Sequence, residues 1–144
     1  MKKIFICLSV FLLAVACKDS KKGESVPLEK QAYIGRMPAA TGKGISCELN
    51  LNVSVADGDT TFLFMQTLLP DNVTKKEISD VVKGIQHHEV RMREGVEQQY
   101  LKLVPASGSM EYVFRVVNDS LLRMVRDDYM EYSDNQYSDF KRIF

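Results

Sequence analysis

Residues 45–55 read Ile-Ser-Cys-Glu-Leu-Asn-Leu-Asn-Val-Ser-Val, and apolar side chains alternate with polar ones along the whole stretch. A period of two places every second side chain on one face of a strand, so one face of this strand is expected to lie in a core. Asp57-Gly58 ends the pattern, and a second β-rich run covers residues 61–69. We therefore expect residues 45–69 to form a hairpin with its turn at residues 56–59.

Further short β-like runs follow, and turn residues separate them. The expected strands cover residues 85–93, 98–104, 110–117, 120–126 and 137–144, with turns at Gly95, at residues 105–108 and at Asn118-Asp119. Many short strands with tight turns and no long helix between them are typical of an antiparallel meander. The fold class is therefore expected to be all-β, closed as a small barrel or folded as a sandwich.

One segment favours a helix by local rules. Thr74 and Glu77 have the spacing of a capping box, apolar residues at helical spacing follow, and Gly84 can end a helix. The same residues 78–82 also alternate acceptably for a strand, and a helix of two turns is marginal by itself. The local pattern leaves both alternatives open.

The start of the chain has the parts of a signal peptide. Residues 1–3 are positively charged at two lysines, residues 4–15 are almost wholly apolar, and Ala14-Val15-Ala16 supplies small residues for cleavage. An apolar stretch of this length is too short to cross ~30 Å of hydrocarbon as a permanent helix. We therefore expect residues 1–16 to be removed.

The cleavage region also resembles a bacterial lipobox. Residues 13–17 read Leu-Ala-Val-Ala-Cys, and in a lipobox the cysteine becomes the lipidated first residue of the mature protein. Lys18 follows in place of the Asp that favours inner-membrane retention, so we expect Cys17 to hold the protein by a lipid at the outer membrane of the cell envelope. The face of that membrane stays open, and ordinary secretory cleavage that releases a soluble protein is the alternative.

The chain is therefore expected to have three parts, of which the signal peptide of residues 1–16 is the first. After Cys17, residues 17–31 are mostly Lys, Ser, Glu, Gly and Pro, a composition typical of a flexible tether. We expect residues 32–144 to form a single domain, the β-barrel.

Composition and charge exclude several classes of protein. A chain of 144 residues has room for one ordinary domain, which excludes a large multidomain enzyme. Lys+Arg and Asp+Glu are both 19, so no basic excess points to nucleic acid. Because the chain lacks a Gly-x-Ser-x-Gly elbow, a phosphate loop and a paired metal motif, we expect a non-enzymatic protein. We expect a monomer whose partners are the membrane, through the lipid, and an envelope protein.

The cysteines leave no pair for an intramolecular disulfide. We expect Cys7 to be removed with the signal and Cys17 to be acylated, which leaves Cys47 alone. Cys47 is in the apolar phase of its strand, which favours a small buried core residue, with a reactive thiol as the alternative.

The most specific motif leads directly into the alternating strand. Residues 33–45 read Tyr-Ile-Gly-Arg-Met-Pro-Ala-Ala-Thr-Gly-Lys-Gly-Ile. With the lipobox, this opening resembles the N-terminal domain of the NlpE lipoproteins, a copper-resistance and envelope-stress family whose opening reads roughly Tyr-x-Gly-x-Leu-Pro-Cys-Ala-Asp-Cys-x-Gly-Ile. The resemblance continues through residues 100–105, 112–114 and 121–125, and so spans most of the mature chain.

The resemblance implies a small antiparallel up-and-down (lipocalin-like) barrel on an outer-membrane lipid anchor, with strand rather than helix over residues 77–93. It also implies a role in envelope stress, surface sensing or copper homeostasis through protein interaction. The paired cysteines of the family fall on Ala39 and Gly42, so this loop has no thiolate for Cu(I) or for a redox disulfide. We therefore expect no cofactor, with copper possible only through other ligands.

A binding role could be assigned to four residues of the motif: Tyr33, Gly35, Pro38 and Gly44. The glycines and the proline also suit a tight, irregular connection into the first long strand, which is a purely structural role.

Metal ligands other than cysteine are few. His87 and His88 are adjacent, and neighbours on a strand point to opposite faces, so they share one ion only with help from a bulge or another strand. Met37 and Met65 could offer thioethers to copper, although methionines scattered over several strands are typical of core filling. The metal candidates are therefore Met37, Met65, His87 and His88.

A competing function is a lipocalin-type carrier with a small apolar ligand or a metal ion inside the barrel. A carrier needs a vacant cavity with some polar groups, whereas a sensor needs only a packed core and a partner-facing rim. The acidic and aromatic residues 127–132 either coordinate a cation, cap a barrel end, or form an exposed connection before the last strand.

Overall fold

The computed structural model describes residues 29–39, 43–53, 61–70, 77–133 and 138–144. The core-facing strand expected from the alternating pattern is present as β2 (Ile45–Leu51), and its buried side chains alternate with partly exposed ones. The strand is shorter than the expected residues 45–55, because Asn52 takes a left-handed backbone conformation with φ of 57°. Residues 54–60, and with them the expected turn of this hairpin, lie outside the described residues.

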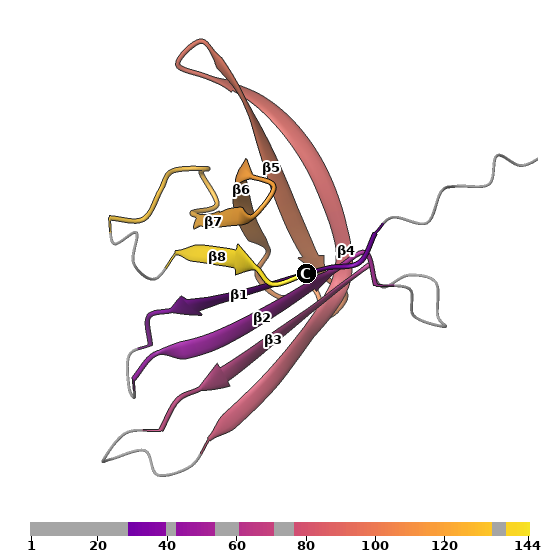
Figure 1. Ribbon diagram of the computed structural model, residues 1–144, viewed down its shortest axis with the longest axis vertical. Coiled ribbons are helices and arrows are strands. Elements are labelled where there is room, and N and C mark those ends of the chain that lie inside the picture. The colour runs from indigo at the N-terminus through magenta and orange to yellow at the C-terminus, as the bar shows by residue number, and fades with distance from the viewer. Residues whose placement is uncertain (1–28, 40–42, 54–60, 71–76, 134–137) are drawn as a thin grey trace, which may run out of the picture.

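The described residues form eight strands in an all-β, closed, antiparallel up-and-down barrel, in which each strand pairs with the next and the last pairs with the first (Figure 1). The expected fold class is confirmed, and the sandwich alternative was wrong. The strands other than β2 are β1 (Gln31–Met37), β3 (Phe62–Leu68), β4 (Ile78–Arg93), β5 (Val96–Pro105), β6 (Tyr112–Asn118), β7 (Leu121–Val125) and β8 (Asp139–Arg142). In this part of the chain, no helix has the length and apolar composition that crossing a membrane requires.

Strand β1 was not expected, because the motif that starts at Tyr33 was interpreted as an irregular connection. Gly35 suggested a break in regular structure. Gly35 lies inside β1, where an added Cβ would come within 2.7 Å of Cγ of Phe140 on β8. The glycine therefore lets an aromatic ring of the closing strand lie directly on β1. The closing strand itself ends at Arg142, before the expected residue 144.

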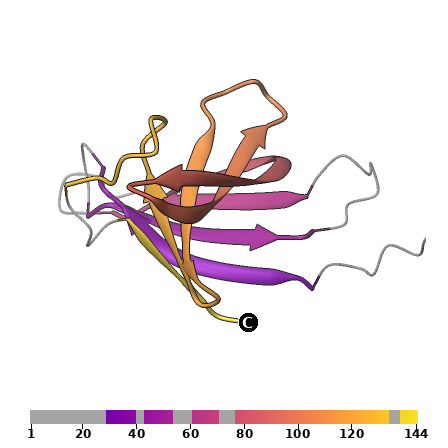
Figure 2. The same ribbon diagram turned by 90° about the horizontal axis from the view of Figure 1, so that it is seen from above.

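Strand β4 confirms the expected strand over residues 77–93, and the helical alternative was wrong for the described part of that segment. Thr74 lies outside the described residues. Gly84 does not terminate a helix but forms the corner of a long strand: β4 pairs with β3 up to Gly84 and with β5 from Gly84 onward. Seen from above, strands β1–β3 run across the direction of β5–β7, which such a corner permits (Figure 2).

Large apolar side chains fill the barrel interior. Three aromatic rings lie at its centre, with Phe114 and Phe140 edge to face at 5.0 Å and Phe64 at 6.2 Å and 6.0 Å from them. The buried side chains around them include Leu49, Leu51, Phe62, Leu101, Leu103 and Leu122. Burial of this aromatic and aliphatic cluster is the main stabilising contribution to the fold.

Candidate functional site

The motif residues take packing and turn positions. Tyr33 is buried in the core, and its burial raises the pKa of its hydroxyl. Gly35 is covered by the aromatic ring of β8, and Gly44 has a φ of 101°, a conformation that favours glycine. Pro38 is exposed just after β1, and Gly42 lies outside the described residues. Packing and backbone geometry account for the described part of this motif.

The candidate metal ligands are not brought together. Met37 packs against the interior cluster, whereas Met65 is on the outer surface of β3. His88 lines a cavity at the barrel mouth, and His87, its neighbour along β4, faces the opposite way. Among the described residues, no group of three or more His, Cys, Asp or Glu side chains is close enough to hold a metal ion.

Cys47 is a buried core residue, as the alternating pattern predicted. Burial raises the pKa of its thiol to about 12, because the charged thiolate would lose its hydration. A thiol in this state is a poor nucleophile and a poor metal ligand at neutral pH.

One end of the barrel is open and carries a cavity of about 190 Å³, which we call the mouth cavity. Its wall combines apolar and polar side chains from several strands, among them Tyr33, Leu51, His88, Leu101, Asp119 and Arg142. Sequence reasoning named Tyr33 and His88 as separate candidates, and the structure places both in this wall.

The hairpin of β4 and β5 extends well beyond the rest of the barrel beside this mouth (Figure 1). Its tip is the expected turn at Gly95, with φ of 77° there and 51° at Glu94, so a turn of two residues joins the strands. On the face continuous with the barrel interior, Val90 and Met92 are 59% and 69% exposed. The extended hairpin therefore presents apolar side chains to solvent on its inner face.

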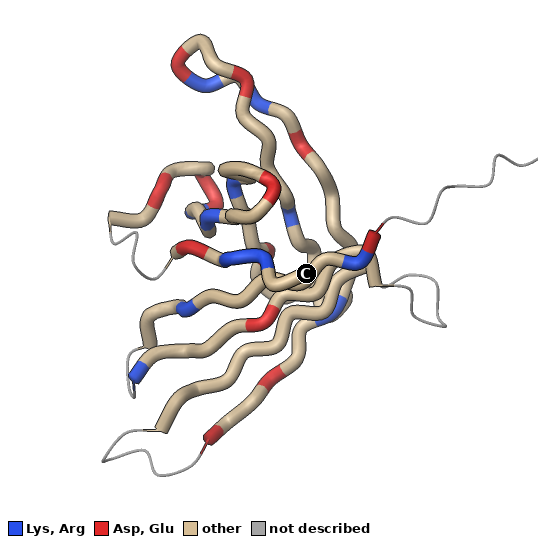
Figure 3. Tube along the Cα trace, viewed as in Figure 1, with Lys and Arg blue, Asp and Glu red and all other residues tan. Residues whose placement is uncertain are grey.

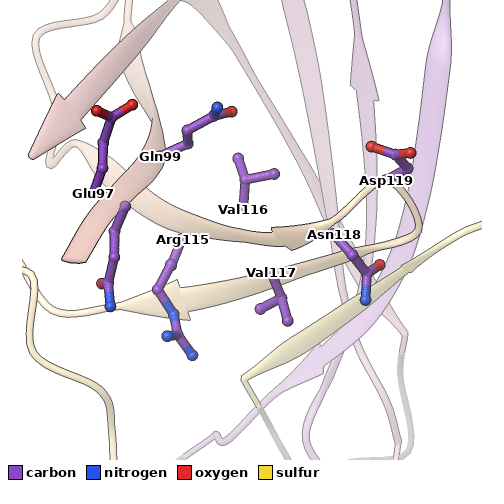
Figure 4. Close-up of a pocket in the computed structure, with 8 residues that line it drawn as sticks. Glu97, Gln99, Arg115, Val116, Val117, Asn118 and Asp119 are labelled. Carbon is purple, nitrogen blue, oxygen red and sulfur yellow. The ribbon is translucent and has the colours of Figure 1, made fainter.

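A second cavity, of about 400 Å³, lies where β5 and β6 separate, and we call it the seam cavity. In the described residues, the ladder between these strands ends at Tyr100 opposite Arg115, although both strands continue past that pair. In Figure 4, Glu97, Gln99, Val116 and Asp119 point to one side of the seam, and Arg115, Val117 and Asn118 point to the other. The mouth cavity and the seam cavity share Gln99, Val116, Asn118 and Asp119, so they form one continuous open end.

Charge at the open end is mixed along the hairpin, which carries acidic residues at 89, 94 and 97 and basic residues at 91 and 93 (Figure 3). Glu97 and Asp119, which flank the seam cavity, form no ion pair with another described residue. Arg115 is already paired with Glu131. A molecule that enters the seam cavity therefore meets two carboxylates without an ion-pair partner among the described residues.

The connection between β7 and β8 holds the hairpin from its outer side. The ring of Tyr129 packs edge to face on Tyr100 at 5.0 Å, and the Arg91 guanidinium lies 3.7 Å from the Tyr129 ring centroid. The Tyr129 hydroxyl donates to Glu89 at 2.7 Å, and Arg93 donates to the Tyr129 carbonyl oxygen. The expected exposed connection is thus partly packed, and it contacts β4 from Glu89 to Arg93.

Sequence reasoning missed the residues of the open end. Val90 and Met92 were assigned to a strand, but nothing local showed that this strand extends beyond the barrel. The only available signal was the length of the two β-like runs on either side of Gly95.

Comparison with known proteins assigns this chain to no family. No family model matches the chain, and no curated protein or solved structure matches it. The functional interpretation therefore depends on the sequence motifs, the fold and the open end of the barrel.

Proposed function

We propose that this protein is a bacterial outer-membrane lipoprotein of the NlpE type, anchored by a lipid on Cys17, whose barrel is a non-enzymatic protein-interaction module. Its role would lie in envelope stress, surface sensing or copper homeostasis. The lipobox and the opening motif support the class, and residues 1–28 lie outside the described residues.

The observation that carries the interaction role is the combination of a filled barrel and an extended hairpin. The interior is occupied by aromatic and aliphatic side chains, while Val90 and Met92 are exposed beside the mouth. Neighbouring exposed apolar side chains that form a contiguous patch with a polar rim are typical of protein-binding surfaces. A packed core with a partner-facing rim is what an interaction module needs.

A carrier is the second candidate, and the mouth cavity is the observation that favours it. Its volume of about 190 Å³ is below the roughly 300–1,000 Å³ of cavities that bury drug-sized ligands. A carrier confined to the mouth cavity would therefore take only a small molecule, whereas one that also used the continuous seam cavity of about 400 Å³ has room for a larger ligand.

Copper handling is tested separately. We expect no tight, stoichiometric uptake of Cu(I) or Zn(II) by the chain from Lys18 to Phe144 under anaerobic conditions, because the candidate ligands lie apart. Uptake that Met37→Leu or His87→Ala/His88→Ala weakens would restore a direct metal role.

The interaction role is tested by photo-crosslinking in cells with the full, lipid-modified chain. A photoreactive amino acid replaces Met92 on the hairpin, and the same replacement at Met65 on the outer face of β3 is the control. We expect a discrete higher-mass protein adduct from position 92 and none from position 65. Adducts of equal yield at both positions, or none at either, would contradict the proposal. Cys17→Ala is expected to abolish both lipid labelling and the adduct.

A further inference from the structure

The separation of β5 from β6 allows a more specific statement about the partner, which rests on the proposed function. We propose that an extended strand of the partner protein, with basic and apolar side chains in alternation, adds to the unpaired edge of β5 at residues 97–99 and occupies the seam cavity. Main-chain pairing with an exposed sheet edge is an established mode of peptide recognition.

The turn at the hairpin tip fixes which backbone groups of β5 face the seam. Its two residues, 94–95, have positive φ, and a turn of this kind is closed by hydrogen bonds between the flanking Arg93 and Val96. Hydrogen-bonded and non-hydrogen-bonded pairs alternate along antiparallel strands. The N–H and C=O groups of Glu97 and Gln99 therefore point away from β4 and toward the seam.

Strand β6 presents the opposite edge of the seam. By the same alternation Leu101 faces β6, where it is opposite Phe114. Two residues further on, Val116 directs its N–H and C=O groups to the seam, beyond the last pair of the β5–β6 ladder. Both walls of the seam thus offer backbone donors and acceptors that no described strand uses.

A second long free edge among the described strands, on β4 before Gly84, is different. There the N–H of Val81 donates to the side chain of Asp80 at 2.9 Å. The carbonyl of Lys83 accepts from the N–H of Ala106 at 2.9 Å. Because its own chain satisfies these groups, this edge is a poorer template for another strand than the seam.

The side chains around the seam define the chemistry of the added strand. On the inner side, the carboxylates of Glu97 and Asp119 have no ion-pair partner among the described residues, so basic side chains complement them (Figure 4). On the outer side, Val96 and Val117 are exposed apolar residues. Successive side chains of a strand face opposite sides, so basic and apolar residues in alternation suit both.

The test is an NMR titration of the ¹⁵N-labelled chain from Lys18 to Phe144, which contains every described residue, with the capped peptide Lys-Val-Lys-Val-Lys-Val-Lys. Amide shifts are expected to centre on Glu97, Gln99 and Val116. Methylation of alternate peptide nitrogens, or Glu in place of Lys, is expected to weaken binding about tenfold or more, because backbone hydrogen bonds or charge pairs are lost.

Variants of the chain separate backbone from side-chain recognition. Gln99→Pro removes an N–H that faces the seam and is expected to weaken peptide binding about tenfold. Gln99→Ala keeps that N–H and is expected to leave peptide binding unchanged. Glu97→Lys with Asp119→Lys should weaken binding of the lysine peptide and improve binding of the glutamate peptide. This reversal keeps the test decisive even where the proline variant fails to fold.

Several results would overturn the inference without touching the proposed function. They are the absence of binding, binding that N-methylation leaves unchanged, and shifts centred on the β4 edge before Gly84. Dimerisation that shifts the seam amides without peptide would assign the seam to a second copy of this chain. Conversely, seam binding of the peptide without any Met92 crosslink in cells would count against the proposed function.

Discussion

Gly84→Ala is expected to destabilise the barrel more than any other glycine-to-alanine change at a described position. The new Cβ would be 2.0 Å from the Val104 carbonyl oxygen, where ordinary contacts begin at 3.4 Å, and 2.8 Å from the Ala106 nitrogen. These neighbours are backbone atoms, so β5 itself must move. Overpacking costs about 1–3 kcal/mol, and loss of the adjacent hydrogen bond from Ala106 to Lys83 adds about 1 kcal/mol.

We therefore expect Gly84→Ala to lower the free energy of unfolding by about 3 kcal/mol, which corresponds to a decrease in Tm of about 10 °C for a domain of this size. Urea denaturation followed by circular dichroism measures it. Gly108→Ala is the matched control, because Gly108 has a φ of 73° but nothing within 4 Å of an added Cβ, so only backbone strain of about 1 kcal/mol applies. Equal decreases in the free energy of unfolding for the two variants would refute the close approach of β5 to Gly84 as the cause.

Three further changes test other parts of the structure. Gly35→Ala should lower the free energy of unfolding by about 1–3 kcal/mol in urea denaturation, because the added Cβ meets the Phe140 ring. Phe140→Leu in the same chain should recover part of this loss of stability. Strictly additive effects of the two substitutions would count against the contact. Cys47 should resist alkylation by iodoacetamide at pH 8 in the folded protein and react after unfolding, since burial raises its pKa to about 12; rapid native labelling would contradict its burial. The Tyr129 hydroxyl and Arg91 hold the pKa of Glu89 below its ordinary value of 4.5, so its contribution to stability is present above that pH and is lost as the pH falls through the folded-state pKa. Glu89→Gln should therefore lower stability at pH 7 and flatten its decline on the acid side, and an unchanged pH profile would show that these bonds contribute nothing.

Local periodicity predicted the strands whose one face lies in the core. Residues 45–51 alternate cleanly because the barrel interior accepts only apolar side chains, and the turns at Gly95 and at residues 105–108 follow from turn chemistry. Strand β1 escaped prediction because Gly35 suggested a break, although its cause is the Phe140 ring from the far end of the chain. The helix signal at Glu77 failed for the same kind of reason, since pairing with β3 overrides a local cap.

The open end could not be predicted, because it depends on how far each pair of strands stays together. The β4–β5 ladder reaches Arg93, whereas the β5–β6 ladder ends at Tyr100, and the length of the β-like runs on either side of Gly95 does not say where the second ladder ends. The exposure of Met92 and the unpaired seam both follow from that mismatch. The residue type of His88 made it a candidate ligand in the sequence. Only the topology of the barrel, however, places it at the mouth cavity.

The central claim is that the open end holds a protein partner, and shortening the hairpin tests it most directly. Replacing residues 90–99 by Asn-Gly rejoins Glu89 to Tyr100, which form a hydrogen-bonded pair by the alternation along this ladder, and removes no buried core residue. The measurement is the amount of partner that co-purifies with the full, lipid-modified chain from crosslinked envelopes, compared with the shortened chain at equal expression and equal Tm. We predict that the partner is lost with the hairpin. Recovery of the same partner in the same amount would contradict the claim.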